Sequence, residues 1–313
     1  MKKLIIVLTL SISTIGLCGI TYAKNIVTDG LVSYWTFDQG DIVDNTVKDA
    51  WGENDATIVG NPIIVNGRVK DALRFDGIKD YVNLTTLGNF GAKLDTSTFE
   101  VWIKTDYKDT WTTLFKVRDQ GFGFKTGMGW GIDINRTLED PRNIGLMERV
   151  NRALNKEDIG DQLIYGENII LTFLLTFKAN IIGRSEYFSI HRFPISDGEW
   201  HHIAYVNEPS YFDEDGEEVK VNSLFIDGTL NRISKPKHKH PNKYLPFFEP
   251  VYLGAGNNQG QAEGFFNGII DEVRIYDRPL TEAEIMHNYQ STTGLAVEHK
   301  DKLPTVCGAL KKR

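Results

Sequence analysis

The stretch that decides the fold runs from Phe265 to Leu280 and reads FFNGIIDEVRIYDRPL. Successive side chains of a β-strand point to opposite faces. This spacing predicts that Asp271 shares one face with three β-branched apolar residues: Ile269, Val273 and Ile275. A carboxylate in such surroundings is costly without a partner. Backbone donors or a cation must therefore compensate Asp271, and calcium is a hard cation that takes oxygen ligands of this kind.

A short helix is predicted directly after this strand. Thr281 and Glu284 have the Thr-x-x-Glu spacing of a capping box, in which each side chain bonds the backbone N–H of the other residue. The helix is expected from Glu282 to Gln290.

The first 23 residues have the pattern of an export signal. Lys2 and Lys3 precede a largely apolar run from Leu4 to Leu17, and Ala23 ends a segment that fits a small-residue cleavage site. Cleavage after Ala23 is the favoured interpretation, and lipid attachment at Cys18 is the alternative. The expected location is therefore secreted, either periplasmic or extracellular. No later stretch is long and apolar enough to predict a membrane helix.

Charge and cysteine content restrict the function classes. The 313-residue chain has a formal net charge of -7, and removing Lys2 and Lys3 gives -7 - 2 = -9. Such an acidic chain argues against nucleic acid as a partner. Only Cys307 remains after cleavage, so no intrachain disulfide is available and stability must come from packing or a bound metal.

The rest of the chain reads as short strands separated by turns. Alternating apolar runs, punctuated by Gly, Asn and Asp, predict an all-β, two-sheet antiparallel sandwich with one short C-terminal helix. We expect a domain over residues 24–290, with an elaborated insertion at 118–196 that lengthens one sheet or covers one end. The basic tail, 291–313, shows no periodicity and is expected to be poorly ordered.

Several segments in this order resemble the laminin-G-like, concanavalin A-like jelly-roll domains of secreted bacterial proteins. The matching segments are Gly30–Asp38, Leu73–Gly77, Asp80–Val82, Phe99–Ile103, Asp197–Ala204, Leu224–Gly228, Leu253–Gly254 and Gly268–Leu280. The resemblance implies two curved antiparallel sheets, usually a binding role, and often a structural calcium ion.

The resemblance also suggests calcium ligands. Asp271 and Asp38 are the candidates, and the ends of the strands that carry them would lie close enough to clamp one ion with backbone carbonyls near Asp76 and Gly77. In the alternative interpretation, Asp38 caps a turn and Asp271 accepts backbone hydrogen bonds.

No catalytic constellation is found. Laminarinase-like enzymes of this fold carry Glu-x-Asp-x-Glu, whereas the nearest match here keeps Asp133 but has Gly131 and Asn135 in place of the two glutamates. Asp271 and Glu272 are not expected to form a pair, because adjacent strand residues point to opposite faces. The predicted function is therefore non-catalytic. A hydrolase or lyase using unrecognised acids, such as Glu100 and Glu199, remains the alternative.

Candidate ligand-binding residues come from aromatic rings and from the resemblance. Trp111 and Trp130 lie in or beside the insertion, where a ring could stack on a pyranose, although burial within the sheet is the competing interpretation. Resemblance to the pentraxins suggests Asp80, Asn257 and Asn258 as further contacts. The histidines His201 and His202, by contrast, are expected to pack in the sheet.

The overall prediction is a secreted module that binds a glycan or another extracellular macromolecule, with a structural calcium ion. The first alternative is a polysaccharide hydrolase or lyase. The second is a structural or adhesive domain that self-associates through exposed sheet edges.

Overall fold

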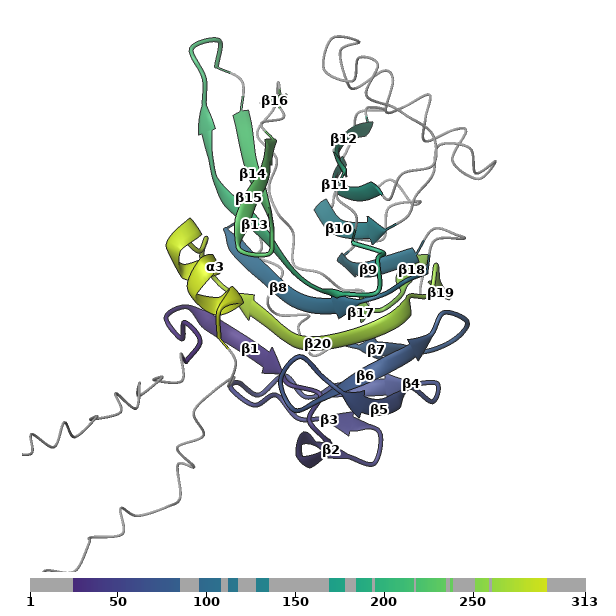
Figure 1. The fold of residues 1–313 in the computed structure, drawn as a ribbon. Coiled ribbons are helices and arrows are strands. Elements are labelled where there is room, and N and C mark those ends of the chain that lie inside the picture. Colours follow the sequence, from purple (N-terminus) through teal and green to yellow (C-terminus); the bar gives the residue numbers. More distant parts are fainter. Residues whose placement is uncertain are drawn as a thin grey trace, which may run out of the picture.

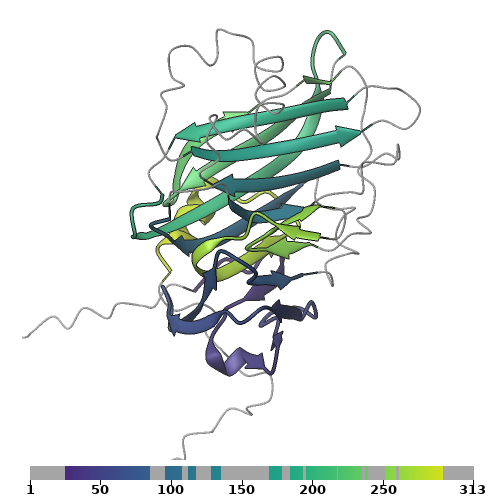
Figure 2. The ribbon, with the colours of Figure 1, turned by 90° about the vertical axis from the view of Figure 1, so that its right-hand side faces the viewer.

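The computed structural model describes eleven stretches of the chain: residues 25–84, 96–107, 112–117, 128–134, 169–177, 184–192, 195–216, 218–234, 237–238, 251–258 and 261–291. Within these stretches the chain forms two large antiparallel sheets stacked as a sandwich, with a short helix against the outer side of one sheet (Figure 1). In the orthogonal view of Figure 2, neighbouring arrows alternate in direction, as antiparallel pairing requires. The predicted fold class is confirmed.

The first sheet has nine strands. Along its main path the order is β15 (Thr229–Ser234), β14 (Glu218–Ile226), β13 (Trp200–Phe212), β8 (Ser97–Lys104), β20 (Asn267–Tyr276), β6 (Asp71–Asp76) and β5 (Ile63–Asn66). Two strands lie off this path: β1 (Leu31–Trp35) pairs with β20, and β16 (Lys237–His238) pairs with β14. The stretch quoted at the outset supplies β20, which lies in the middle of this sheet.

The second sheet also has nine strands. Their order is β12 (Arg184–Arg192), β11 (Ile169–Phe177), β10 (Met128–Ile134), β9 (Thr112–Val117), β17 (Tyr252–Leu253), β7 (Tyr81–Asn83), β4 (Ala56–Val59), β3 (Thr46–Val47) and β2 (Ile42–Val43). Strands β10, β11 and β12 fall within the expected insertion and continue this sheet at one edge. A separate ribbon joins β18 (Gly256–Asn258) to β19 (Gln261–Glu263).

The main core fills the space between the two sheets. Side chains of β8 and β13, such as Val101 and Ile203, meet side chains of the second sheet such as Val82. Phe99 of β8 and Phe115 of β9 stack across the interface, with ring centroids 4.2 Å apart. Burial of large apolar surface of this kind is the main stabilising contribution in a domain without disulfides.

A second apolar cluster lies on the outer face of the first sheet. Here Ile285 of helix α3 (Glu282–Tyr289) packs with alternate side chains of the central strands: Ala204, Val206, Phe225 and Tyr276. The capping box is confirmed, because Thr281 accepts from the Glu284 N–H while the Glu284 side chain accepts from the Thr281 N–H. The helix ends at Tyr289, one residue before the predicted end, and Gln290 is its C-cap. A 3₁₀ turn, η1 (Gln39–Asp41), follows β1.

Strand β20 contains a bulge that alternation could not predict. Asp271 pairs with Trp102 and Arg274 with Glu100, so the register shifts between them, and Glu272 has φ of +54°. Ile270, Val273 and Ile275 consequently share the main core, while Asp271 points to the outer face.

Two expectations about β20 are therefore wrong. Asp271 does not share a face with Val273 and Ile275, although it is fully buried as expected. Glu272 lies on the same outer side as Asp271, where its Oε2 accepts from the Tyr34 hydroxyl. The extra residue of the bulge is the physical reason for both differences.

Candidate functional site

Three aromatic rings gather on the outer face of the second sheet. Val82 and Leu253 are buried in the main core, so Tyr81 and Tyr252, which precede them in β7 and β17, point away from it. Phe265 lies just before β20, outside any strand, and its ring contacts Tyr81. The ring centroids of Tyr81 and Tyr252 are 4.7 Å apart, and those of Tyr81 and Phe265 are 6.2 Å apart. We call these three residues the ring platform.

The backbone holds the ring platform in place. Tyr81 pairs with Val59 of β4, and Tyr252 pairs with Asn83 of β7. The Phe266 N–H donates to the Gly254 carbonyl at 2.8 Å, which fixes the segment carrying Phe265 against the end of β17. Gly254 has φ of +78°, a conformation that favours glycine.

The rings differ in their access to solvent. Tyr252 is 4% exposed and packs against Tyr81, whereas Tyr81 and Phe265 are each partly exposed. A partly exposed ring on a fixed backbone offers a flat apolar face with little entropy left to lose on binding. This arrangement suits the apolar face of a sugar ring.

Asp80 lies next to the ring platform but faces inward. It is 2% exposed; its Oδ1 accepts from the Asn61 N–H at 2.8 Å and its Oδ2 from the Asp76 N–H at 3.2 Å. Gly60 leaves room for this carboxylate, since a Cβ there would lie 2.2 Å from Oδ1. In this structure Asp80 therefore ties two turns together beside Tyr81.

The other predicted ligand residues are placed as follows. Asn257 is fully buried in β18, and Asn258 pairs with Gln261 across the β18–β19 ribbon. Trp130 lies in β10, opposite Leu174 of β11 and Val117 of β9. Trp111 lies outside the described residues.

Sequence reasoning missed the ring platform. Tyr81 and Phe265 each belong to a segment that was singled out, but as part of a fold pattern. The available signal for two of the rings was strand alternation, because Tyr81-Val82 and Tyr252-Leu253 each place a ring beside an aliphatic core residue. Phe265 lies outside any strand and gave no such signal. What alternation could not show is that three distant segments bring their rings together.

The metal candidate Asp271 is held mainly by backbone donors. Its Oδ2 accepts from the N–H groups of Arg68 at 2.7 Å and Val69 at 3.1 Å. Its Oδ1 is buried and has no hydrogen-bond partner. Burial, followed by the neighbouring charge of Glu272, raises the pKa of Asp271 well above its ordinary value.

Asp38 contacts the same turn. Its Oδ2 lies 2.6 Å from Nζ of Lys70, and its Oδ1 accepts from the Asp71 N–H at 3.2 Å. The turn that both carboxylates contact therefore lies between β5 and β6, whereas Asp76 accepts from the N–H groups of its own turn, Ile78 to Asp80. Across the described stretches, no three or more His, Cys, Asp or Glu side chains are arranged to hold a metal ion.

The two acids of the hydrolase alternative are far apart. Glu100 is fully buried beneath α3, where Asn288 Nδ2 donates to its Oε2 at 2.8 Å. Glu199 is exposed and immediately precedes Trp200, which pairs with Lys104. Lys104 lies four positions after Glu100 on β8, which corresponds to about 13 Å along the strand. Because glycosidases need carboxyl groups about 5–9 Å apart, this pair does not fit that chemistry.

The two histidines have opposite environments. His201 Nδ1 lies 2.9 Å from Oδ2 of Asp227, and its Nε2 lies 3.1 Å from Oδ1 of Asp197. These hydrogen bonds raise the pKa of His201. His202 is fully buried beside Trp102, and burial lowers its pKa well below the ordinary value.

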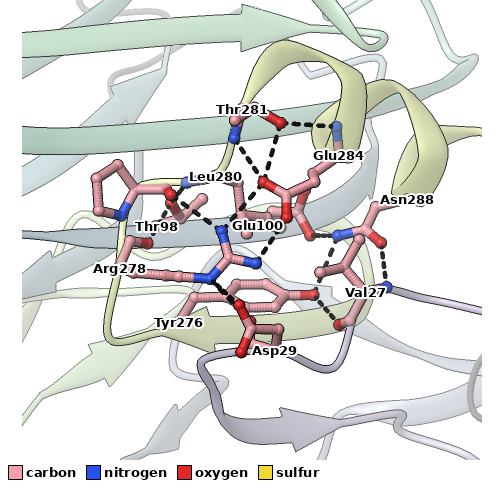
Figure 3. A network of polar contacts seen from close by, with 11 residues as sticks. Val27, Asp29, Thr98, Glu100, Tyr276, Arg278, Leu280, Thr281, Glu284 and Asn288 are labelled. Carbon is pink, nitrogen blue, oxygen red and sulfur yellow. Dashed lines mark hydrogen bonds and ion pairs between the residues drawn. The ribbon is translucent and has the colours of Figure 1, made fainter.

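A polar network joins the helix to the segment before β1 and to residues of β8 and β20, as Figure 3 shows. Asn288 Nδ2 donates to Glu100 Oε2 and to the Tyr276 hydroxyl, while its Oδ1 accepts from the Val27 N–H at 2.8 Å. The guanidinium of Arg278 bonds both carboxylate oxygens of Glu284, at 3.0 and 2.7 Å. This network anchors α3 rather than forming a ligand site.

The comparisons identify the class of fold. Residues 173–286 match the family described as the Concanavalin A-like lectin/glucanases superfamily. This match agrees with the resemblance predicted from the sequence, and the two-sheet sandwich has the concanavalin A-like fold. No curated protein matches the sequence. In the described stretches, no helix has the length and apolar character needed to cross a membrane.

Three solved structures illustrate the likeness. Domain 4 of the extracellular arabinanase AbnA from Geobacillus stearothermophilus, solved in complex with arabinotriose, is 17% identical; the match has a TM-score of 0.50 and covers 83% of this chain and 98% of that one. The binding domain of Paraclostridial Mosquitocidal Protein 1 is 16% identical, with a TM-score of 0.49, over 84% of this chain and 52% of that one. The CBM40 of the Ruminococcus gnavus IT-sialidase is 14% identical, with a TM-score of 0.41, and the match covers 73% of this chain and 96% of that one. At these identities the likeness concerns the fold alone.

Proposed function

We propose that this protein is a secreted, non-catalytic module that binds carbohydrate through the ring platform of Tyr81, Tyr252 and Phe265. The observation that carries the proposal is the pair of partly exposed rings, Tyr81 and Phe265, supported by the buried ring of Tyr252. Aromatic side chains provide large contact area with few rotatable bonds, so little entropy is lost on binding. Domain 4 of the arabinanase, on the same fold, was solved with a bound trisaccharide, which is compatible with this ligand class.

The N-terminal pattern and the burial of acids in the described stretches support the remaining parts of the proposal. Export is inferred from the N-terminal pattern, and an exported module would meet extracellular or periplasmic glycans. A binding role is inferred because Glu100, Asp271 and Glu272 are all buried, so none of these acids can reach a polysaccharide.

The test is an array of neutral, amino and acidic oligosaccharides probed with the mature protein, followed by titration of the best ligand. Replacing Tyr81 or Phe265 with alanine should weaken binding about tenfold, which corresponds to about 1.4 kcal/mol. The matched control is Ile78→Ala, which removes an exposed apolar side chain that is not part of the ring platform. Equal affinity in all variants would contradict the proposal.

Calcium is a separate proposal, in a structural role at Asp271. The supporting observation is the buried Oδ1 of Asp271, a carboxylate oxygen without a hydrogen-bond partner. Asp38 fits less well, because Lys70 Nζ and the Asp71 N–H already contact its two oxygens. A calcium ion bound by Asp271 would screen the carboxylate and secure the turn between β5 and β6.

Self-association is a second candidate function, favoured by one observation. Ile63 and Ile64 are adjacent on β5, and both are exposed, at 56% and 40%. Because β5 is the edge strand of the first sheet, its free backbone groups can pair with another strand. Sedimentation at several concentrations tests this function: mass that rises with concentration, and falls for Ile64→Lys, would favour it.

A further inference from the structure

A further aromatic side chain is exposed and fixed on the loop between β3 and β4. Trp51 is 46% exposed, whereas Trp35 and Trp102 are buried. Its indole N–H donates to the Leu31 carbonyl of β1 at 2.8 Å. One edge of the ring is therefore tied to β1 while the rest faces solvent. An exposed apolar side chain is common on protein surfaces, but one held by a specific hydrogen bond has a defined orientation.

The loop that carries Trp51 is built around a single buried carboxylate. Oδ1 of Asp49 accepts from the N–H groups of Tyr34 at 2.9 Å, Trp51 at 3.1 Å and Gly52 at 2.9 Å. Its Oδ2 accepts from the Asn54 N–H at 3.1 Å. A carboxylate that bonds this many backbone groups defines the loop conformation.

Two further contacts join the loop to β1. The Ala50 N–H donates to the Tyr34 carbonyl at 2.8 Å, and Asn54 Nδ2 donates to the Ser33 hydroxyl at 2.7 Å. Gly52 permits the close approach, because a Cβ there would lie 2.4 Å from the Val32 carbonyl oxygen. The ring is thus oriented before any ligand arrives, which lowers the entropic cost of binding.

The surroundings of Trp51 are polar. Among the described residues, no other large exposed apolar side chain lies on β1 or on the loop between Lys48 and Asp55. The exposed ion pair of Lys48 and Asp55 lies on this loop, together with Glu53. Asp29, 86% exposed and paired with Arg278, lies two residues before the carbonyl that holds the indole.

The polar surroundings of Trp51 favour a sugar rather than a protein as its ligand. A specific protein interface needs about 1,000 Å² of buried surface and a cluster of apolar side chains around its anchor. A single sugar ring needs one aromatic face and a few polar groups at its rim. Asp55 is paired with Lys48 and Asp29 with Arg278, so Glu53 leaves this surface with an excess of negative charge that disfavours acidic sugars.

We propose that Trp51 forms a second carbohydrate contact, on the edge of β1, selective for neutral or amino pyranoses. The ring face of Trp51 stacks on the sugar, and the flanking carboxylates accept hydrogen bonds from its hydroxyl or amino groups. This proposal shares its ligand class with the proposed function but rests on a different loop and a different ring, which is tied to β1 and has no contact with the ring platform among those described. Either contact can therefore exist without the other.

The experiment uses the mature protein and four probes: xylotriose, laminaritriose, chitotriose and a hyaluronan tetrasaccharide. Affinity is measured by calorimetry for the wild-type protein and for Trp51→Ala, Trp51→Phe, Tyr81→Ala and the control Ile78→Ala. For at least one neutral or amino probe, Trp51→Ala should lose about tenfold in affinity, and Trp51→Phe should retain part of it. Circular dichroism of each variant checks that the fold is intact.

Each outcome decides between the two contacts. A loss of affinity in Trp51→Ala, with unchanged affinity in Tyr81→Ala, supports the Trp51 contact and contradicts sugar binding by the ring platform. The reverse pattern overturns the Trp51 contact alone. Preference for the hyaluronan probe, absence of binding to every probe, or equal affinity in Trp51→Ala and Ile78→Ala would also overturn it.

Discussion

Nδ2 of Asn288, on helix α3, donates to Oε2 of Glu100, on β8, at 2.8 Å, and both side chains are fully buried. This bond joins the C-terminal helix to the middle of the first sheet. Oε1 of the same carboxyl has no hydrogen-bond partner and lies 3.7 Å from Nε2 of His202. Arg274 Nε, at 3.4 Å from Oε2, is the nearest positive charge.

The first prediction follows from the ionisation of Glu100. Burial raises its pKa from 4.5 to about 7, although Arg274 and Asn288 act in the opposite direction. The folded state therefore holds the proton more tightly than the unfolded chain. The stabilisation from this proton is complete below pH 4.5 and is lost as the pH rises to about 7, an effect of about 3 kcal/mol.

Glu100→Gln should remove this part of the pH dependence, because glutamine does not titrate. The measurement is the free energy of unfolding in urea from pH 4.5 to 8, compared with wild type. Glu214→Gln, in the exposed turn after β13, is the control and should follow the wild-type curve. Parallel curves for Glu100→Gln and wild type would contradict the prediction.

The second prediction concerns His201, which bridges Asp227 and Asp197. Its pKa is raised first by the hydrogen bond to Asp227 and further by Asp197, so the folded state favours the imidazolium. The resulting stabilisation is complete below pH 6.5 and is lost as the pH rises through the raised value. His201→Gln should therefore lower the melting temperature more at pH 6 than at pH 9. An equal decrease at both pH values would show that the charge does not contribute.

The third prediction addresses the attachment of α3. Asn288→Ala removes the donor to Glu100 and the acceptor of the Val27 N–H, and should lower the free energy of unfolding by about 1–3 kcal/mol. Amide hydrogen exchange should become faster at Val27 in particular. Gln290→Ala, with an exposed side chain at the end of the same helix, serves as the control. Unchanged exchange at Val27 would show that Asn288 does not hold this segment.

The fourth prediction tests calcium. If Asp271 binds an ion, adding a chelator should lower the melting temperature of the mature protein, because a ligand of the native state stabilises it by mass action. Asp271→Asn should abolish this response, while Asp41→Asn, on the nearby η1 turn, should retain it. A melting temperature insensitive to both chelator and added calcium would leave backbone hydrogen bonds as the role of Asp271.

Local patterns in the sequence predicted the architecture well. The alternation in Phe99–Ile103 and in Trp200–Val206 marks two central strands of the first sheet, which pair with each other in the structure. The capping box at Thr281 also predicted where α3 begins. These signals are contained in short segments, so one sequence is sufficient to read them.

Features that depend on distant contacts could not be read in this way. The bulge in β20 changes the face of Asp271, and it is visible only in the pairing with Trp102 and Glu100. The ring platform likewise combines residues 81, 252 and 265, whose proximity depends on the arrangement of the whole second sheet. Trp51 was overlooked because its fixed orientation comes from hydrogen bonds to β1, which no local pattern reveals.

Two hydrogen bonds have a practical consequence for handling this domain. One joins Val27 to Asn288, and the other joins the Asn25 carbonyl to His287. Both contacts lie on the side of the sandwich opposite the ring platform, since α3 covers the first sheet and Tyr81 and Tyr252 belong to the second. A biotin tag or surface tether joined near either position would hold the protein with its rings directed into solution. A circular permutant with a short linker between these neighbouring segments should also fold, with new ends opened elsewhere.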